Sequence, residues 1–152
     1  MSDPAALVEA LEALAARIDG PARVKLGRSL GAELRRANAA RIRANQTPDG
    51  AAMAPRKVKR RSPKRLAKPR GVGKMFRKAA GNRWLQVKAN PEELAVGFFD
   101  TAAAILLQHQ EGGTYRVSRE ADAPQGDYPA RPLLGLTAED RVRILDKVAA
   151  LL

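Results

Sequence analysis

The sequence lacks several residue types and patterns that would point to particular chemistries. It contains no cysteine, which excludes disulfides and thiolate metal sites and is typical of proteins made in a reducing cytoplasm. No run of about 18 apolar residues is present, and the N-terminal residues lack the basic region of a secretory signal. We therefore expect a soluble protein that neither spans a membrane nor is exported by a signal peptide.

Catalytic motifs are also scarce. His109 is the only histidine, and a lone histidine beside an apolar segment is more often structural than catalytic. The residues from Gly71 to Lys74 resemble the end of a phosphate-binding loop, but Lys68 replaces its first glycine and Met75 replaces the final Ser/Thr. The carboxylates are scattered and form no pair that we can assign to one cleft. The sequence therefore predicts a protein that is not an enzyme and uses no cofactor or metal.

The length and composition are those of one small domain. A chain of 152 residues can bury a single modest core, so we expect residues 1–152 to form one domain. Apolar residues make up 45% of the sequence but aromatic residues only 4%. We expect a core of leucine and valine on helices, in which Trp84, Phe98 and Phe99 are the rare bulky side chains.

Hydrophobic spacing predicts an α+β fold. A helix is expected to begin at Asp3-Pro4 and to end at Gly20-Pro21, and a second helix should follow over 22–45 and pack against it as an antiparallel hairpin. Alternating apolar residues over 83–89 and 94–100 predict a small antiparallel β-sheet. A short buried helix over 101–110 should follow, then a third strand over 114–118 and an exposed connector over 119–127.

The last helix should be capped by Thr137 and Asp140 in a capping-box arrangement. Each long helix carries apolar residues at helical spacing, which we assign to its buried face. These residues are Leu7, Leu11, Leu14 and Ile18 in the first helix; Leu26, Leu30, Leu34 and Ala37 in the second; and Val142, Leu145, Val148 and Leu152 in the last.

The net charge of +12 is concentrated in one part of the chain. No Asp or Glu occurs between Asp49 and Glu92, and half of the 28 basic residues lie in that interval. Its densest part contains two prolines and few apolar residues, which predicts an extended, solvated loop. We call residues 55–73 the basic arm. The cations that we expect to bind an anionic partner are Arg56, Lys57, Lys59, Arg60, Arg61, Lys64, Arg65, Lys68 and Arg70.

Two kinds of partner fit the basic arm equally well. Its cations could neutralise several phosphates of a nucleic acid, in a salt-sensitive and sequence-independent way. No aromatic residue interrupts the run, so stacking on bases is not indicated. Alternatively, the arm could become ordered against an acidic protein neighbour in an assembly. The residues alone leave both partners open.

Three stretches of the sequence, in this order and spacing, resemble the phage virion morphogenesis family. They are residues 46–50 (Gln-Thr-Pro-Asp-Gly) with 54–57 (Ala-Pro-Arg-Lys), residues 109–112 (His-Gln-Glu-Gly), and residues 128–136 (Tyr-Pro-Ala-Arg-Pro-Leu-Leu-Gly-Leu). The last stretch is the most specific. The likeness also includes the two N-terminal helices and the basic arm, so it covers nearly the whole chain.

The resemblance implies a structural virion protein of contractile-tailed phages, a tail completion protein that caps the tail tube and joins tail to head. It implies a homo-oligomeric ring, expected to be a hexamer, that is assembled in the host cytoplasm and retained in the tail or neck of the virion. The implied partners are other copies of the chain, the tail tube or sheath protein, the head–tail connector, and DNA in the lumen; no membrane is implied.

A proline-fixed segment loses little conformational entropy on docking, so part of the 128–136 stretch is a candidate assembly interface. The same segment could instead brace the core before the last helix. The candidate interface residues are Tyr128, Pro129, Arg131, Pro132, Leu133 and Leu134.

Two other hypotheses come from different classes of protein. One is a small cytoplasmic protein that binds nucleic acid through the basic arm without sequence specificity. The other is an enzyme that acts on DNA, which would require clustered carboxylates or a metal site that the sequence does not show.

Overall fold

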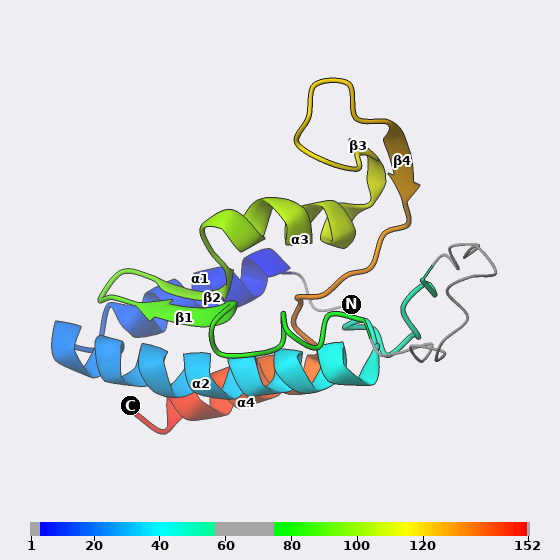
Figure 1. The fold of residues 1–152 in the computed structure, drawn as a ribbon. Helices are drawn as coiled ribbons and strands as arrows, with labels where there is room; N and C mark the ends of the chain where they lie inside the picture. Colours follow the sequence, from blue (N-terminus) through cyan, green and yellow to red (C-terminus); the bar gives the residue numbers. More distant parts are fainter. Residues whose placement is uncertain (1–3, 57–74, 152) are drawn as a thin grey trace.

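The computed structural model describes residues 4–56 and 75–151 (Figure 1), and most of the basic arm lies outside these residues. The described residues form four helices and two antiparallel two-stranded sheets, so the predicted α+β class is confirmed. In chain order the elements are α1 (Pro4–Ala15), α2 (Gly20–Ala44), β1 (Leu85–Ala89), β2 (Leu94–Phe98), α3 (Thr101–Glu111), β3 (Gly113–Arg116), β4 (Gln125–Tyr128) and α4 (Ala138–Ala149).

Strands β1 and β2 and helix α4 all pack on the long helix α2 (Figure 1). Its N-cap is Asp19, whose Oδ1 accepts a hydrogen bond from the Ala22 N–H at 2.8 Å. Gly20 and Pro21 are therefore the first residues of α2, whereas the sequence pattern predicted them as the end of the first helix. The physical reason is that proline at the start of a helix loses no intrahelical hydrogen bond. At the other end, Asn45 adopts the left-handed conformation with φ 55°.

The hairpin of β1 and β2 lies directly on α2. Its register pairs Val87 with Val96 and Ala89 with Leu94. A Cβ atom at Gly31 of α2 would overlap the Val87 side chain and lie 2.9 Å from Leu94 Cδ1. The sheet can approach the helix this closely because position 31 is glycine.

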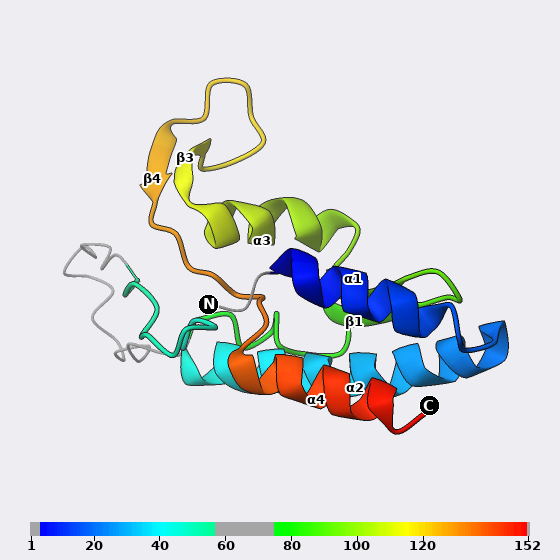
Figure 2. The ribbon, with the colours of Figure 1, turned by 180° about the vertical axis from the view of Figure 1, so that it is seen from behind.

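Helix α4 runs beside α2 and packs on it (Figure 2). Ile144 and Val148 are buried there against Leu30 and Leu34. The predicted stripe of α4 was partly wrong, because Val142 is 56% exposed and Leu145 is 39% exposed. The pair Ile144 and Val148 and the pair Val142 and Leu145 both have helical spacing. Only the packing of α4 on α2 decides which pair is buried.

Helix α1 runs antiparallel to α2 but packs against α4 (Figure 2). Leu7 and Leu11 are half-buried. Ile18 is buried, as predicted, although α1 ends before it at Ala15. The predicted cap Asp3 lies outside the described residues, as does Leu152 of the last stripe.

The segment after β2 differs from the sequence prediction in two ways. Helix α3 is buried only along Ala102 and Leu106, whereas Ile105 and Leu107 are 54% and 53% exposed. The strand predicted over 114–118 is present as β3, but it pairs with β4, which begins inside the predicted connector. The β4 sequence Gln-Gly-Asp-Tyr has no hydrophobic alternation, so its strand character comes from pairing and not from its own pattern.

Candidate assembly site at the root of the basic arm

The basic arm leaves the fold from a tight loop that follows α2. Gln46 and Ala52 form a β-bridge across this loop, and Gly50 turns it with φ 86°, as the Pro-Asp-Gly sequence predicts. The Met53 N–H donates to the Asn45 carbonyl at 2.8 Å, and the Met53 side chain is 5% exposed in the core. The chain is therefore fixed in place immediately before the arm begins.

Arg131 holds the first residues of the arm. Its side chain is buried, with Nε donating to the Ala54 carbonyl at 2.7 Å and Nη2 donating to the Pro55 carbonyl at 2.9 Å. Arg56, the next residue, is exposed. Hydrogen bonds from a charged donor are stronger than neutral ones, and two of them in a fixed fork also set direction. We call this arrangement the Arg131 clamp.

Gln110 fixes the segment that carries the clamp. Its Oε1 accepts from the backbone N–H groups of Leu133 at 2.6 Å and Leu134 at 3.0 Å, and its Nε2 donates to the Leu134 carbonyl at 3.1 Å. The Arg131 N–H also donates to the His109 carbonyl at 2.7 Å. One side chain thus satisfies three backbone groups of an irregular segment, while the Leu133 side chain is completely buried beside it.

A second polar network holds the end of this segment near Gly135. The Asn38 Oδ1 accepts from the Gly135 N–H at 3.2 Å, and Arg41 donates to the Gly135 carbonyl at 2.7 Å. Arg41 also forms an ion pair at 2.9 Å with Asp140, which is 1% exposed. Asp140 shares the capping box of α4 with Thr137, as predicted. This network ties the segment to both α2 and α4.

The Gly135 backbone also packs closely on the loop at the root of the arm. A Cβ atom at this position would lie 2.8 Å from Pro48 Cβ, so any larger residue would push the loop away. We use the name motif junction for residues 128–135 together with the groups that hold them, which are Asn38, Arg41, Ala54, Pro55, His109, Gln110 and Asp140.

The His109 ring lies at one edge of the motif junction among aromatic side chains. Its centroid is 4.9 Å from that of Phe76 and 5.5 Å from that of Tyr128, both in edge-to-face geometry. Burial, followed by the nearby Arg131 charge, lowers the pKa of His109 below its ordinary value. The neutral ring is therefore favoured, and His109 acts as a packing group. Phe76 follows the arm in the sequence, so its contact with His109 holds the chain just after the arm.

The motif junction brings together three stretches that are far apart in the sequence, namely residues 46–55, 109–112 and 128–135. All three stretches also lie within one match to a family of known proteins. The sequence profile of the phage virion morphogenesis family matches residues 3–152. The chain belongs to the phage virion morphogenesis family.

A relative of this family member is tail completion protein S of Escherichia phage P2. The two sequences are 32% identical over 126 residues, which cover 83% of this chain and 81% of the phage P2 protein. No solved structure gave a significant match.

In this virion morphogenesis protein, the predicted interface residues fall into two groups. Arg131 and Leu133 are buried within the chain, so these two brace the core, which was the alternative that the sequence left open. Four residues are half-buried and retain surface that another molecule can reach: Tyr128, Pro129, Pro132 and Leu134. Their role as an interface stays a prediction.

The predicted anion-binding residues lie almost entirely beyond the described part of the chain. Arg56 is described and its side chain is exposed at the start of the arm. The other eight lie outside the described residues, and their role also stays a prediction: Lys57, Lys59, Arg60, Arg61, Lys64, Arg65, Lys68 and Arg70.

Sequence reasoning missed the polar residues that build the motif junction. Asn38 occupies a buried position of α2, four residues after Leu34 and four before Ile42. A polar side chain on an otherwise apolar stripe is a signal that could have been read, because a buried amide requires partners. Gln110 was noted only as part of a motif. Arg41 is one of several arginines on α2, and no sequence signal marked it as the partner of Asp140.

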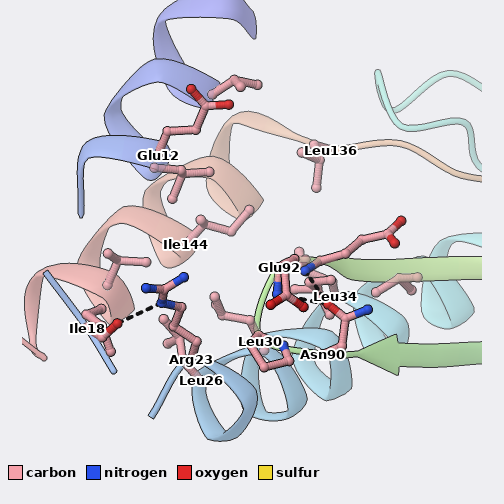
Figure 3. Close-up of a pocket in the computed structure, with 18 of the residues that line it drawn as sticks. Glu12, Ile18, Arg23, Leu26, Leu30, Leu34, Asn90, Glu92, Leu136 and Ile144 are labelled. Atoms are coloured by element: carbon pink, nitrogen blue, oxygen red, sulfur yellow. Dashed lines mark hydrogen bonds between the residues drawn. The ribbon is translucent and has the colours of Figure 1, made fainter. Parts of the chain in front are cut away.

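An apolar cavity of about 880 Å³ lies between α1, α2, the β1–β2 loop and α4 (Figure 3). Leu26, Leu30 and Ile144 contribute to its apolar walls. Arg23 lies in it with its Nε donating to the Ile18 carbonyl at 2.7 Å. Such a lining offers contact for apolar groups.

Residues 4–56 and 75–151 show neither a metal cluster nor a membrane span. No group of three His, Asp or Glu side chains in this part of the chain is arranged to hold a metal ion. None of the helices described there combines the length and the apolar character needed to cross a membrane.

Proposed function

We propose that the chain is a non-catalytic tail completion protein, which assembles as a homo-oligomeric ring, a hexamer, in the neck of the virion. In this role it caps the tail tube and presents the finished tail to the head–tail connector. Membership of the virion morphogenesis family and the similarity to tail completion protein S of phage P2 support this proposal.

The observation that carries the proposal is the convergence of the three family stretches on the root of the basic arm. Arg131, from the third stretch, holds the backbone of the first stretch at Ala54. Gln110, from the second stretch, holds the backbone of the third stretch at Leu133. At this convergence Arg131 holds Ala54 and Pro55, the residues at which the basic arm begins. This is the geometry expected of a subunit that reaches its neighbours.

In the proposed ring, the arm contacts an anionic surface, either an acidic part of a neighbouring subunit or DNA in the lumen. The half-buried residues Tyr128, Pro129 and Pro132 form part of the proposed contact surface. Because two of these residues are prolines and their segment is already fixed by Gln110, docking would order little new chain.

The first experiment removes the protein from an otherwise complete phage. We expect tails of abnormal length or tails that fail to join heads, visible in negative-stain images, and we expect the protein to be present in purified wild-type particles. Tails of normal length that join heads efficiently would contradict the proposal.

The second experiment neutralises the arm by changing Arg60, Arg61, Lys64 and Arg65 to Gln. Solvated positions typically alter stability by only about 0.5 kcal/mol each, so the melting temperature should change little while the phage yield collapses. The matched control changes four exposed cations elsewhere to Gln: Arg17, Lys88, Arg116 and Arg119. An arm variant with the same yield as this control would remove the arm from the mechanism.

The segregated charge also favours a second candidate, a small cytoplasmic protein that binds nucleic acid without sequence specificity. DNA binding alone does not separate the two candidates. Stoichiometric protein in purified particles supports the tail completion role, whereas protein found only in the lysate with free DNA supports the second candidate.

A further inference from the structure

A second basic surface lies on α2, separate from the arm. Five cations of this helix lie along one side, because Lys25 and Arg28 are three residues apart and seven residues separate Arg28 from Arg35 and Arg36 from Arg43. Four of them are exposed, and Arg35 is half-buried. The opposite side of α2 carries Gly31, Leu34 and Asn38, which pack against the sheet, α4 and the motif junction.

The segment of residues 75–84 adds further cations beside this stripe. Arg35 donates to the Asn82 side chain, and Arg43 Nη2 donates to the Ala80 carbonyl at 3.3 Å, so the segment is bound to α2. Figures 1 and 2 show it along one side of α2 with α4 on the other. The α2 basic face is then made up of the five α2 cations together with Arg77, Lys78 and Arg83, all three exposed.

No carboxylate interrupts this face. The sequence contains no acidic residue from position 50 to position 91, and Glu33 is the only acidic residue of α2. Glu33 lies at the border near Arg36, but it forms an ion pair with Lys147 of α4. That pairing, with a smaller contribution from the Arg36 charge, lowers the pKa of Glu33. Arg36 lies near Glu33, but no cation of the face forms an ion pair in the described part of the chain.

The size and composition of the face favour double-stranded DNA over an acidic protein. From Lys25 to Arg43 the helix rises about 27 Å, and a duplex of that length carries about 16 phosphate charges. Six of the eight cations are arginines, whose planar guanidinium groups suit phosphate oxygens. Hot spots of protein interfaces are enriched in Trp, Tyr and Arg, and the exposed stripe contains no aromatic residue, whereas protein–DNA interfaces are strongly positive as a whole.

We propose that the α2 basic face binds the phosphate backbone of double-stranded DNA without reading its sequence. This inference is independent of the ring, because it concerns the isolated subunit. The face is built on a helix that packs on the core, so its charges keep a fixed spacing.

The test measures binding of the full chain to a 30-base-pair duplex by fluorescence anisotropy at several salt concentrations. The face variant changes Lys25, Arg28, Arg36 and Arg77 to Gln, because none of the four makes a hydrogen bond or ion pair within the described part of the chain. Each phosphate that the protein no longer neutralises should reduce the slope of log K against log salt by about 0.9. We therefore expect the slope to fall by about three to four and a second duplex of unrelated sequence to give the same result.

Two comparisons make the outcome decisive. The control with Arg17, Lys88, Arg116 and Arg119 changed to Gln has the same net charge as the face variant, so an equal reduction in both would overturn the proposal. The arm variant, tested alone and combined with the face variant, separates the two basic regions: a slope that depends on the arm only would also overturn it. A face variant that binds DNA normally but fails to assemble into particles would reassign the face to an acidic protein partner.

Discussion

The motif junction and the hairpin of β3 and β4 are neighbours that are held in opposite ways. In the motif junction, side chains reach backbone groups far away in the sequence, as Gln110 does to Leu133 and Arg131 does to Ala54. In the hairpin, contacts are local, such as Thr114 to Asp127 at 2.6 Å across the strands. The hairpin projects beyond α3 (Figure 1), and its Val117 side chain is 54% exposed.

This difference separates contacts that stabilise the whole fold from contacts that stabilise only the β3–β4 hairpin. Long-range bonds in the motif junction connect α2, α3, α4 and the arm root, so a defect there affects several elements at once. Local bonds in the hairpin stabilise only the hairpin, whose detachment would leave the core intact. Substitutions in the two regions should therefore differ in cost even when the chemistry of the change is the same.

The largest expected difference is between two apolar truncations. Leu133→Ala removes a completely buried side chain of the motif junction and should reduce the free energy of unfolding by roughly 2–5 kcal/mol. Val117→Ala removes an exposed side chain of the hairpin and should change it by about 0.5 kcal/mol or less. Urea denaturation of both variants measures the contrast, and equal costs would show that the hairpin is part of the core.

A smaller difference is expected between two arginines. Arg131→Met keeps much of the side-chain volume but leaves the Ala54 and Pro55 carbonyls without their charged donor, a cost of about 1.5–3 kcal/mol. Arg119→Met changes an exposed residue of the hairpin loop and is the matched control. Limited proteolysis should also cut the Arg131→Met variant faster near Pro55. An unchanged cleavage rate there would mean that the clamp does not hold the arm root.

The smallest effect concerns His109, which lies where the two regions meet. Its pKa is lowered in the folded protein, so the unfolded chain binds the proton more readily. The stability due to neutral His109 is fully present above the unfolded pKa of about 6.5 and is lost as the pH falls through the lower folded value. The melting temperature should therefore fall more between pH 7 and pH 5 in the wild type than in His109→Gln. Parallel curves would show that another group is responsible.

Much of the fold could be predicted from local patterns in the sequence. The turn at Gly50 and the cap at Thr137 involve residues close in the chain, so their chemistry is visible in the sequence. The hairpin of β1 and β2 was visible for the same reason, through alternation. The buried face of α4 was assigned incorrectly because Leu145 and Ile144 are equally apolar, and only the partner helix decides between them.

The candidate site was predictable in part. The sequence identified the stretches that meet at the motif junction, but not that they meet each other. Contacts such as Arg41 with Asp140, or Arg131 with Pro55, join residues that no local pattern links. Arg131 was a candidate for an interface between molecules because its proline-fixed segment loses little conformational entropy on docking, and bracing of the core was the alternative. Its burial follows from two carbonyl partners that a sequence does not display.

The Arg131 clamp has a consequence for how this chain can vary. It binds the arm only through main-chain carbonyls, those of Ala54 and Pro55, which every sequence possesses. The direction in which the arm departs is therefore independent of the side chains that follow it. The cations of the arm can therefore be replaced in evolution, which would change the partner of the arm, while the contacts of Arg131 stay the same.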